Sequence, residues 1–205
     1  MSPALDIEQP ALLLSYLRTT HRIGATETPH LTVLQGGVSN RTVLVERAHG
    51  PGMVLKQALS KLRVPEDWFC DPSRIHRESL GLAWLNRLAP PGTIAPLLFE
   101  DREHHLLAMQ AVPQPHDNWK TRLLAGAMDR RHVEQFGQLL GTIHRRARDH
   151  AGELSATLGD RTFFETLRIE PYYRFAATRA PAAASFLNRL IEDTLATRLT
   201  LVHGD

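Results

Sequence analysis

Two prolines separated by a single residue, Pro113 and Pro115, form the sharpest boundary in the sequence. Proline fixes φ and lacks a backbone N–H, so a pair this close interrupts either a helix or a strand. Short strand patterns dominate before the prolines, and amphipathic helix patterns dominate after them. The chain is therefore predicted to be α+β, with a sheet-based N-terminal lobe over residues 1–112 and a mainly helical lobe over residues 113–205. A cleft between two such lobes is a natural place for a ligand.

Alternating apolar residues separated by turn residues predict an antiparallel sheet in the first lobe. A meander is expected from strands at 31–34, 41–47 and 53–58, with turns at 35–40 and 49–52. A second strand pair is expected at 95–100 and 104–109, around a turn at 101–103.

Apolar residues at helical spacing predict the remaining elements. One helix is expected over residues 7–20, and another is expected to start with Asp71 as N-cap and Pro72 as first helical residue and to end near Leu88. In the second lobe we expect helices at 130–149, 171–179 and 182–196, followed by a short strand at 199–202.

The charge balance argues against a dedicated nucleic-acid-binding protein. The chain has 24 Lys and Arg residues against 22 Asp and Glu residues, a net charge of +2, whereas such proteins carry a marked basic excess. Cys70 is the only cysteine, which excludes an intramolecular disulfide and a multi-cysteine metal site. The sequence shows no secretory leader pattern and no apolar run of ~18 residues. We therefore expect a cytoplasmic protein that binds neither nucleic acid nor a membrane.

The turn at Gly36 and Gly37 is the first of four candidate functional motifs. Glycine lets the backbone approach a ligand closely and point its N–H groups toward it. Ser39 and Asn40 follow and add side-chain donors. The same residues also suit an ordinary hairpin turn that binds nothing.

Lys56 and Glu78 are the second and third candidates. Lys56 lies in an apolar strand, so its side chain either faces solvent or enters a polar cleft, where its compact charge suits a phosphate. Glu78 follows 22 residues later, on the predicted helix that begins near residue 71. A carboxylate there could pair with Lys56, although a solvated glutamate is the simpler interpretation.

Asp205 is the fourth candidate, at the end of the sequence His203-Gly204-Asp205. A carboxylate that follows an apolar strand can accept the proton of a substrate hydroxyl. A tripeptide of this kind also occurs by chance.

The order of these motifs resembles that of the protein-kinase-like fold, and His-Gly-Asp resembles the aminoglycoside phosphotransferase and choline kinase family. The resemblance covers nearly the whole chain. It implies an antiparallel-sheet N-lobe with a mainly helical, incomplete C-lobe, ATP as phosphoryl donor, Mg²⁺ as the metal, and a small-molecule hydroxyl as acceptor. Within this family the chain looks most like methylthioribose kinase, on residues 54–59, 62–64 and 66–68 and on Arg74 with the helix that carries Glu78.

The resemblance also implies a role for each matching residue. The nucleotide phosphates would be covered by Gly36, Gly37, Ser39 and Asn40. Lys56 would contact the α- and β-phosphates, and Glu78 would orient it. The adenine would meet an inter-lobe hinge made by Met109, Gln110 and Ala111. Asp205 would be the catalytic base or an orienting carboxylate.

The family pattern continues past His-Gly-Asp to an asparagine and an acidic metal-binding segment. We therefore expect the chain to be the front part of a longer kinase, inactive as it stands, with its Mg²⁺ ligands beyond residue 205. The acceptor would be a sugar such as methylthioribose, or an amino-alcohol or aminoglycoside, and incomplete cover of the helical lobe would permit a homodimer. The alternative is a non-catalytic nucleotide-binding or interaction module derived from a kinase.

Overall fold

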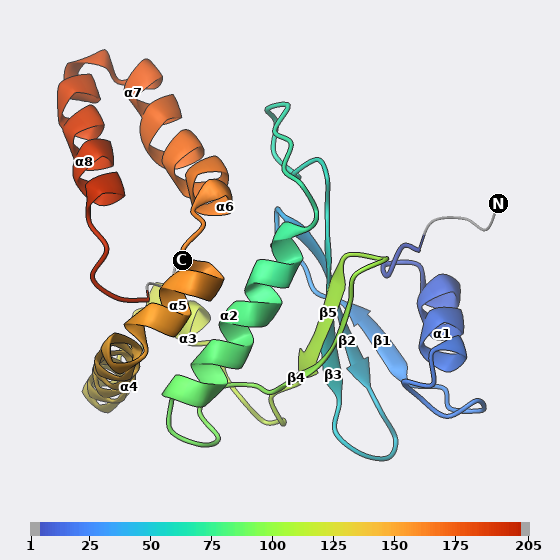
Figure 1. Ribbon diagram of the computed structural model, residues 1–205. Helices are drawn as coiled ribbons and strands as arrows, with labels where there is room; N and C mark the ends of the chain where they lie inside the picture. Colours follow the sequence, from blue (N-terminus) through green and yellow to red (C-terminus); the bar gives the residue numbers. More distant parts are fainter. Residues whose placement is uncertain (1–4, 202–205) are drawn as a thin grey trace. The chain divides into compact units, whose positions relative to one another are not determined.

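The computed structural model describes residues 5–201 and divides the chain into two compact units, residues 1–130 and 131–205. The first unit holds the sheet with two long helices, and the second is helical (Figure 1). The α+β class is thereby confirmed. The lobe boundary expected at residue 112 stays a prediction.

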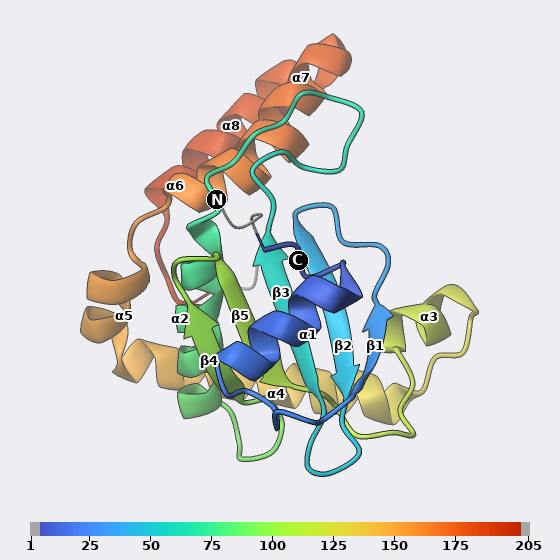
Figure 2. The same cartoon turned by 90° about the vertical axis from the view of Figure 1, so that its right-hand side faces the viewer.

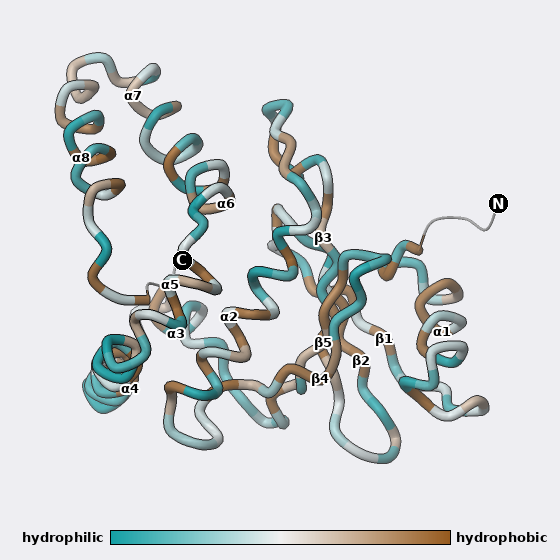
Figure 3. The backbone as a smooth tube through the Cα atoms, in the orientation of Figure 1, coloured by the Kyte–Doolittle hydropathy of each residue, from teal (hydrophilic) through white to brown (hydrophobic). Residues whose placement is uncertain are grey.

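The sheet of the first unit has five antiparallel strands in the order β1-β2-β3-β5-β4 (Figure 2). The strands are β1 (His30–Val33), β2 (Asn40–Glu46), β3 (Met53–Ala58), β4 (Leu97–Asp101) and β5 (Leu106–Gln110). The predicted meander and the predicted second strand pair are both confirmed. Hydrophobic residues run along the strands (Figure 3).

The turn between β4 and β5 is longer than predicted, and β5 begins at Leu106 instead of His104. The Asp101 side chain accepts a hydrogen bond from the His104 N–H at 3.0 Å. His105 has a φ of 48°, in the left-handed region that a strand residue does not adopt. Both features keep these histidines in the turn.

Helix α1 (Pro10–Thr19) covers one face of the sheet (Figure 2). It begins three residues later than predicted because Pro10, with no N–H to donate, occupies the first turn. The core between α1 and the sheet is formed by Leu13, Tyr16 and Leu17 of the helix and by Val43, Val45, Met53, Leu55, Leu106 and Ala108 of the strands.

Helix α2 (Arg74–Leu88) lies on the opposite face, so the sheet separates the two helices (Figure 1). The predicted N-cap was wrong, since Ser73 holds that position. The Asp71 side chain instead accepts the Ser73 N–H at 2.8 Å and closes a turn that precedes the helix. The predicted end at Leu88 is confirmed.

The rest of the chain is helical. Its elements are α3 (Trp119–Leu124), α4 (Arg130–Asp149), α5 (Ala151–Leu158), α6 (Thr162–Phe164), the π-helix η1 (Glu165–Arg174), α7 (Phe175–Arg179), the 3₁₀ turn η2 (Pro181–Ala183) and α8 (Ala184–Ala196). The helix expected at 130–149 is confirmed, and the one expected at 182–196 is present as η2 and α8. None of the helices among residues 5–201 is long and apolar enough to cross a membrane.

Two predictions in the second unit were wrong. The helix expected at 171–179 starts at Thr162, because Pro171 lies inside the π-helix instead of opening a helix. Residues 199–201 form no strand, and Val202 lies outside the described residues. Leu199 is 81% exposed, and the Thr200 hydroxyl donates to the His144 carbonyl at 3.2 Å. This contact to α4 replaces the strand pairing that the apolar sequence suggested.

An ion pair in the first unit gives a pH-dependent stability. Arg47 donates to both carboxylate oxygens of Glu27, at 2.7 and 2.8 Å. These bonds lower the pKa of Glu27 from 4.5 to about 2. A lowered pKa stabilises the fold above pH 4.5, and this stabilisation is lost as the pH falls toward 2. We expect the unfolding free energy of the wild type to exceed that of Glu27→Gln at pH 6 and to converge with it near pH 2, in urea titrations. A difference that stays constant with pH would contradict this.

Candidate functional site

Lys56 lies in the middle of β3, on the sheet face that α2 covers. Its register neighbours are Thr42 on β2 and Leu107 on β5. Its ammonium group forms an ion pair and hydrogen bond with Glu78 of α2. The two side chains are 26% and 38% exposed, so the pair is shielded from solvent on some sides and open on others. The sequence left open whether the Lys56 side chain faces solvent or enters a polar cleft. The structure shows its ammonium group in a polar contact with Glu78.

Apolar packing between α2 and the sheet fixes the position of Glu78. Ile75 of α2 packs against Leu107 and Ala58 in a small buried cluster. Ile75 and Glu78 are three residues apart and therefore lie on one side of the helix. Burial of Ile75 thus brings the Glu78 carboxylate over β3, where Lys56 meets it.

The turn that contains Gly36 and Gly37 joins β1 to β2. Gly36 has a φ of 101°, which glycine adopts without strain, and a Cβ there would meet nothing within 4 Å. The conformation of the loop, and not a close contact, therefore requires glycine at residue 36. Two backbone hydrogen bonds hold the loop from the segment after β3, from Leu59 N–H to Ser39 O at 3.0 Å and from Arg63 N–H to Val38 O at 2.8 Å.

An apolar strip lies beside Lys56 on the same sheet face. Leu44, Val54 and Met109 are register neighbours on β2, β3 and β5, and all three are half-buried. Met109 was among the predicted site residues, whereas Leu44 and Val54 were not. The period-two rule could have found Val54, because residues i and i−2 of a strand share a face.

The predicted hinge residues occupy the end of β5 and the residue after it. The Gln110 N–H donates to the Pro96 carbonyl at 2.9 Å, and the Ala111 N–H donates to the Gly52 carbonyl at 2.9 Å. A base bound at this segment therefore cannot use these two N–H groups unless these bonds break.

Arg74 is a buried charge on α2 that was not among the predicted site residues. Its guanidinium donates to the carbonyls of Cys70, Asp71 and Ser39. Burial lowers the pKa of Arg74, while the nearby Cys70 and the Glu78 carboxylate raise it. No charge pattern in the sequence distinguishes this arginine from the others. Cys70 itself is buried, and burial raises the pKa of its thiol.

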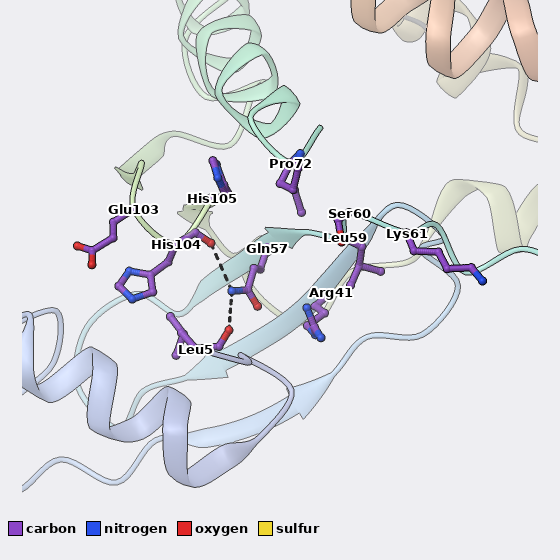
Figure 4. Close-up of a pocket in the computed structure, with 11 residues that line it drawn as sticks. Leu5, Arg41, Gln57, Leu59, Ser60, Lys61, Pro72, Glu103, His104 and His105 are labelled. Atoms are coloured by element: carbon purple, nitrogen blue, oxygen red, sulfur yellow. Dashed lines mark hydrogen bonds between the residues drawn. The ribbon is translucent and has the colours of Figure 1, made fainter. Parts of the chain in front are cut away.

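A separate cavity of about 600 Å³ lies at another part of the first unit (Figure 4). Its lining includes Arg41, Gln57, Lys61 and the turn residues 103–105, but neither Lys56 nor Glu78. The Gln57 amide crosses it and donates to the Leu5 carbonyl at 2.9 Å and the His104 carbonyl at 3.3 Å. We therefore place the candidate site at the Lys56–Glu78 pair and not in this cavity.

The structure brings Lys56 and Glu78 into contact and ties Ser39 to the same helix through Arg74. Gly36 and Gly37 lie in the loop that Ser39 ends, and Asn40 begins β2 two residues before Thr42, the register neighbour of Lys56. Among residues 5–201, no three His, Cys, Asp or Glu side chains are grouped so that they could hold a metal ion. Asp205 lies outside the described residues.

Comparison with known proteins adds one finding to this geometry. A model of the phosphotransferase enzyme family matches residues 30–205, from the start of β1 to the last residue of the sequence. A comparison with curated proteins gave no match.

Proposed function

Because the chain belongs to the phosphotransferase enzyme family, we propose that it binds ATP on the Lys56 face of the sheet and transfers the γ-phosphoryl group to a hydroxyl of a small molecule. The observation that carries this proposal is the ion pair between Lys56 and Glu78, on the helix that Arg74 joins to the end of the Gly36 loop. A cation that is held in place by a carboxylate, beside a loop of backbone N–H groups, suits the phosphates of a nucleotide.

The phosphates would lie between the loop and Lys56. Lys56 would contact the α- and β-phosphates as a point charge, and Glu78 would keep its long side chain in one orientation. The loop would cover the phosphates through backbone N–H groups at Gly36 and Gly37 and through the side chains of Ser39 and Asn40. Phosphoryl transfer depends mostly on such positioning and charge stabilisation.

The adenine would pack on the apolar strip of Leu44, Val54 and Met109. These side chains are half-buried and lie one register step from Lys56, toward the β5 end that carries the predicted hinge. An apolar surface beside a lysine matches a ligand with a flat base at one end and phosphates at the other.

The acceptor step is proposed from sequence resemblance. The acceptor oxygen would attack the γ-phosphorus, the bond from that phosphorus to the β,γ-bridging oxygen would break, and ADP would leave. Asp205 would orient the hydroxyl and accept its proton. The acceptor class is a sugar such as methylthioribose, or an amino-alcohol. Mg²⁺ is proposed on the family resemblance alone, because the described residues offer no group of three ligands.

Glu78→Gln tests the nucleotide-binding part of this proposal. The wild-type chain should bind ATP in MgCl₂ buffer by titration calorimetry, and the variant should bind about tenfold more weakly, about 1.4 kcal/mol, because a neutral amide holds Lys56 less firmly. Glu66→Gln is the matched control, since Glu66 is exposed in the segment between β3 and α2. A wild-type chain that binds no ATP would overturn the proposal.

A further inference from the structure

Arg74 is 6% exposed, which is unusual for an arginine. Its Nη1 atom donates to the carbonyls of Cys70 and Asp71, at 3.2 Å each, and its Nη2 atom donates to the Ser39 carbonyl. All three acceptors are neutral backbone groups. Among residues 5–201, this buried charge thus binds backbone carbonyls and contacts no carboxylate directly.

These carbonyls belong to two segments that are far apart in the sequence. Ser39 is the last residue of the glycine loop, and Cys70 and Asp71 lead into α2. The guanidinium is a rigid planar fork, so its donors fix the separation and the relative angle of the groups that they bind. Arg74 therefore ties the end of the glycine loop to the start of α2.

The same helix carries the partner of Lys56. Glu78 follows Arg74 by four residues, so the two side chains lie on one side of α2. Burial lowers the pKa of Arg74, and the nearby Glu78 carboxylate opposes that shift. One helical turn thus holds the glycine loop through Arg74 and the lysine through Glu78.

We propose that Arg74 is a positioning residue that sets the distance between the glycine loop and the Lys56–Glu78 pair, and thereby the affinity of the site for nucleotide phosphates. This inference rests on the proposed function. A purely structural arginine would instead stabilise the unit without any preference for phosphates, and the two roles differ in what they predict for ligands with and without phosphates.

The test compares ATP with adenosine in binding to the wild type, Arg74→Met and Arg74→Lys. We expect ATP to bind about tenfold more weakly to Arg74→Met, because the loop loses its tie to α2, and adenosine affinity to change less than about twofold. Arg74→Lys should recover little, since lysine keeps the charge but lacks the fork. Arg87→Met is the control on the same helix, where Arg87 lies over Trp84 with 4.7 Å between guanidinium and ring centre.

If ATP and adenosine affinity fall together, or neither falls, the positioning role is wrong while the proposed function stands. If the wild type binds no ATP, the proposed function fails and this inference fails with it.

Hydrogen exchange on the wild-type chain provides a test that needs no variant, in case both substitutions prevent folding. ATP should slow amide exchange in residues 36–40 and in residues 70–74 together, because Arg74 joins the two segments, and adenosine should slow neither. Slowing confined to residues 36–40 would show that the loop responds without α2 and would overturn the inference.

Discussion

Replacing Lys56 with methionine is expected to weaken ATP binding by at least about 100-fold, about 2.7 kcal/mol, measured by calorimetry on the wild-type and variant chains. The substitution keeps a long apolar side chain in β3 but removes the cation. It also leaves the Glu78 carboxylate without its partner, facing the place proposed for the phosphates. Loss of attraction and gain of repulsion act in the same direction, so we expect a larger effect than for Glu78→Gln.

Lys61→Met is the matched control for this experiment. Lys61 lies five residues further along the chain and is exposed. Its ammonium group pairs with Asp67, and not with Glu78, at an N–O distance of 2.6 Å. We expect its replacement to leave ATP affinity within about twofold, because exposed ion pairs contribute little. Equal losses in the two lysine variants would mean that general positive charge, and not the Lys56 site, determines nucleotide affinity.

The largest effect on stability is expected from Leu55→Ala, which should lower the free energy of unfolding by about 2–5 kcal/mol. Leu55 is 0% exposed and lies between Val43 and Ala108 in the core beneath α1. Its truncation removes buried apolar contacts and leaves a cavity that the strands on both sides cannot close. Urea denaturation monitored by circular dichroism gives the difference.

Leu98→Ala provides the comparison, because Leu98 lies in β4 of the same sheet but is 41% exposed. Its truncation should change the free energy of unfolding by less than about 0.5 kcal/mol. If Leu55→Ala were as mild as Leu98→Ala, the packing of α1 against the sheet would be wrong.

Some elements are predictable because their signals are local. The 20 residues of α4 carry an apolar stripe at helical spacing, and they form one helix with the predicted bounds. The three strands of the meander are likewise present where alternation and turn residues indicate them. The errors arise where a local signal misleads, as at Pro171, which suits the first turn of a helix but lies inside the π-helix.

The candidate site, too, could be predicted from the sequence only in part. The order Gly36, Lys56, Glu78 is visible in the sequence, and with it the hypothesis of a phosphate site. The contact between Lys56 and Glu78 is not visible there, because it depends on Ile75 of α2 packing against Leu107 of β5. Leu44 and Val54 become candidates only when the register places them beside Met109.

The sequence by itself determined the type of most elements and the family, which the match over residues 30–205 shows. Backbone preference and side-chain period act over a few residues, so they can be read locally. Only the tertiary structure decided that β5 lies between β3 and β4, that α1 and α2 take opposite faces, and that Arg74 is buried against Ser39. These features depend on contacts between residues that are far apart in the sequence, which bury apolar surface together and satisfy each other's hydrogen bonds. No local sequence pattern specifies which distant residues meet.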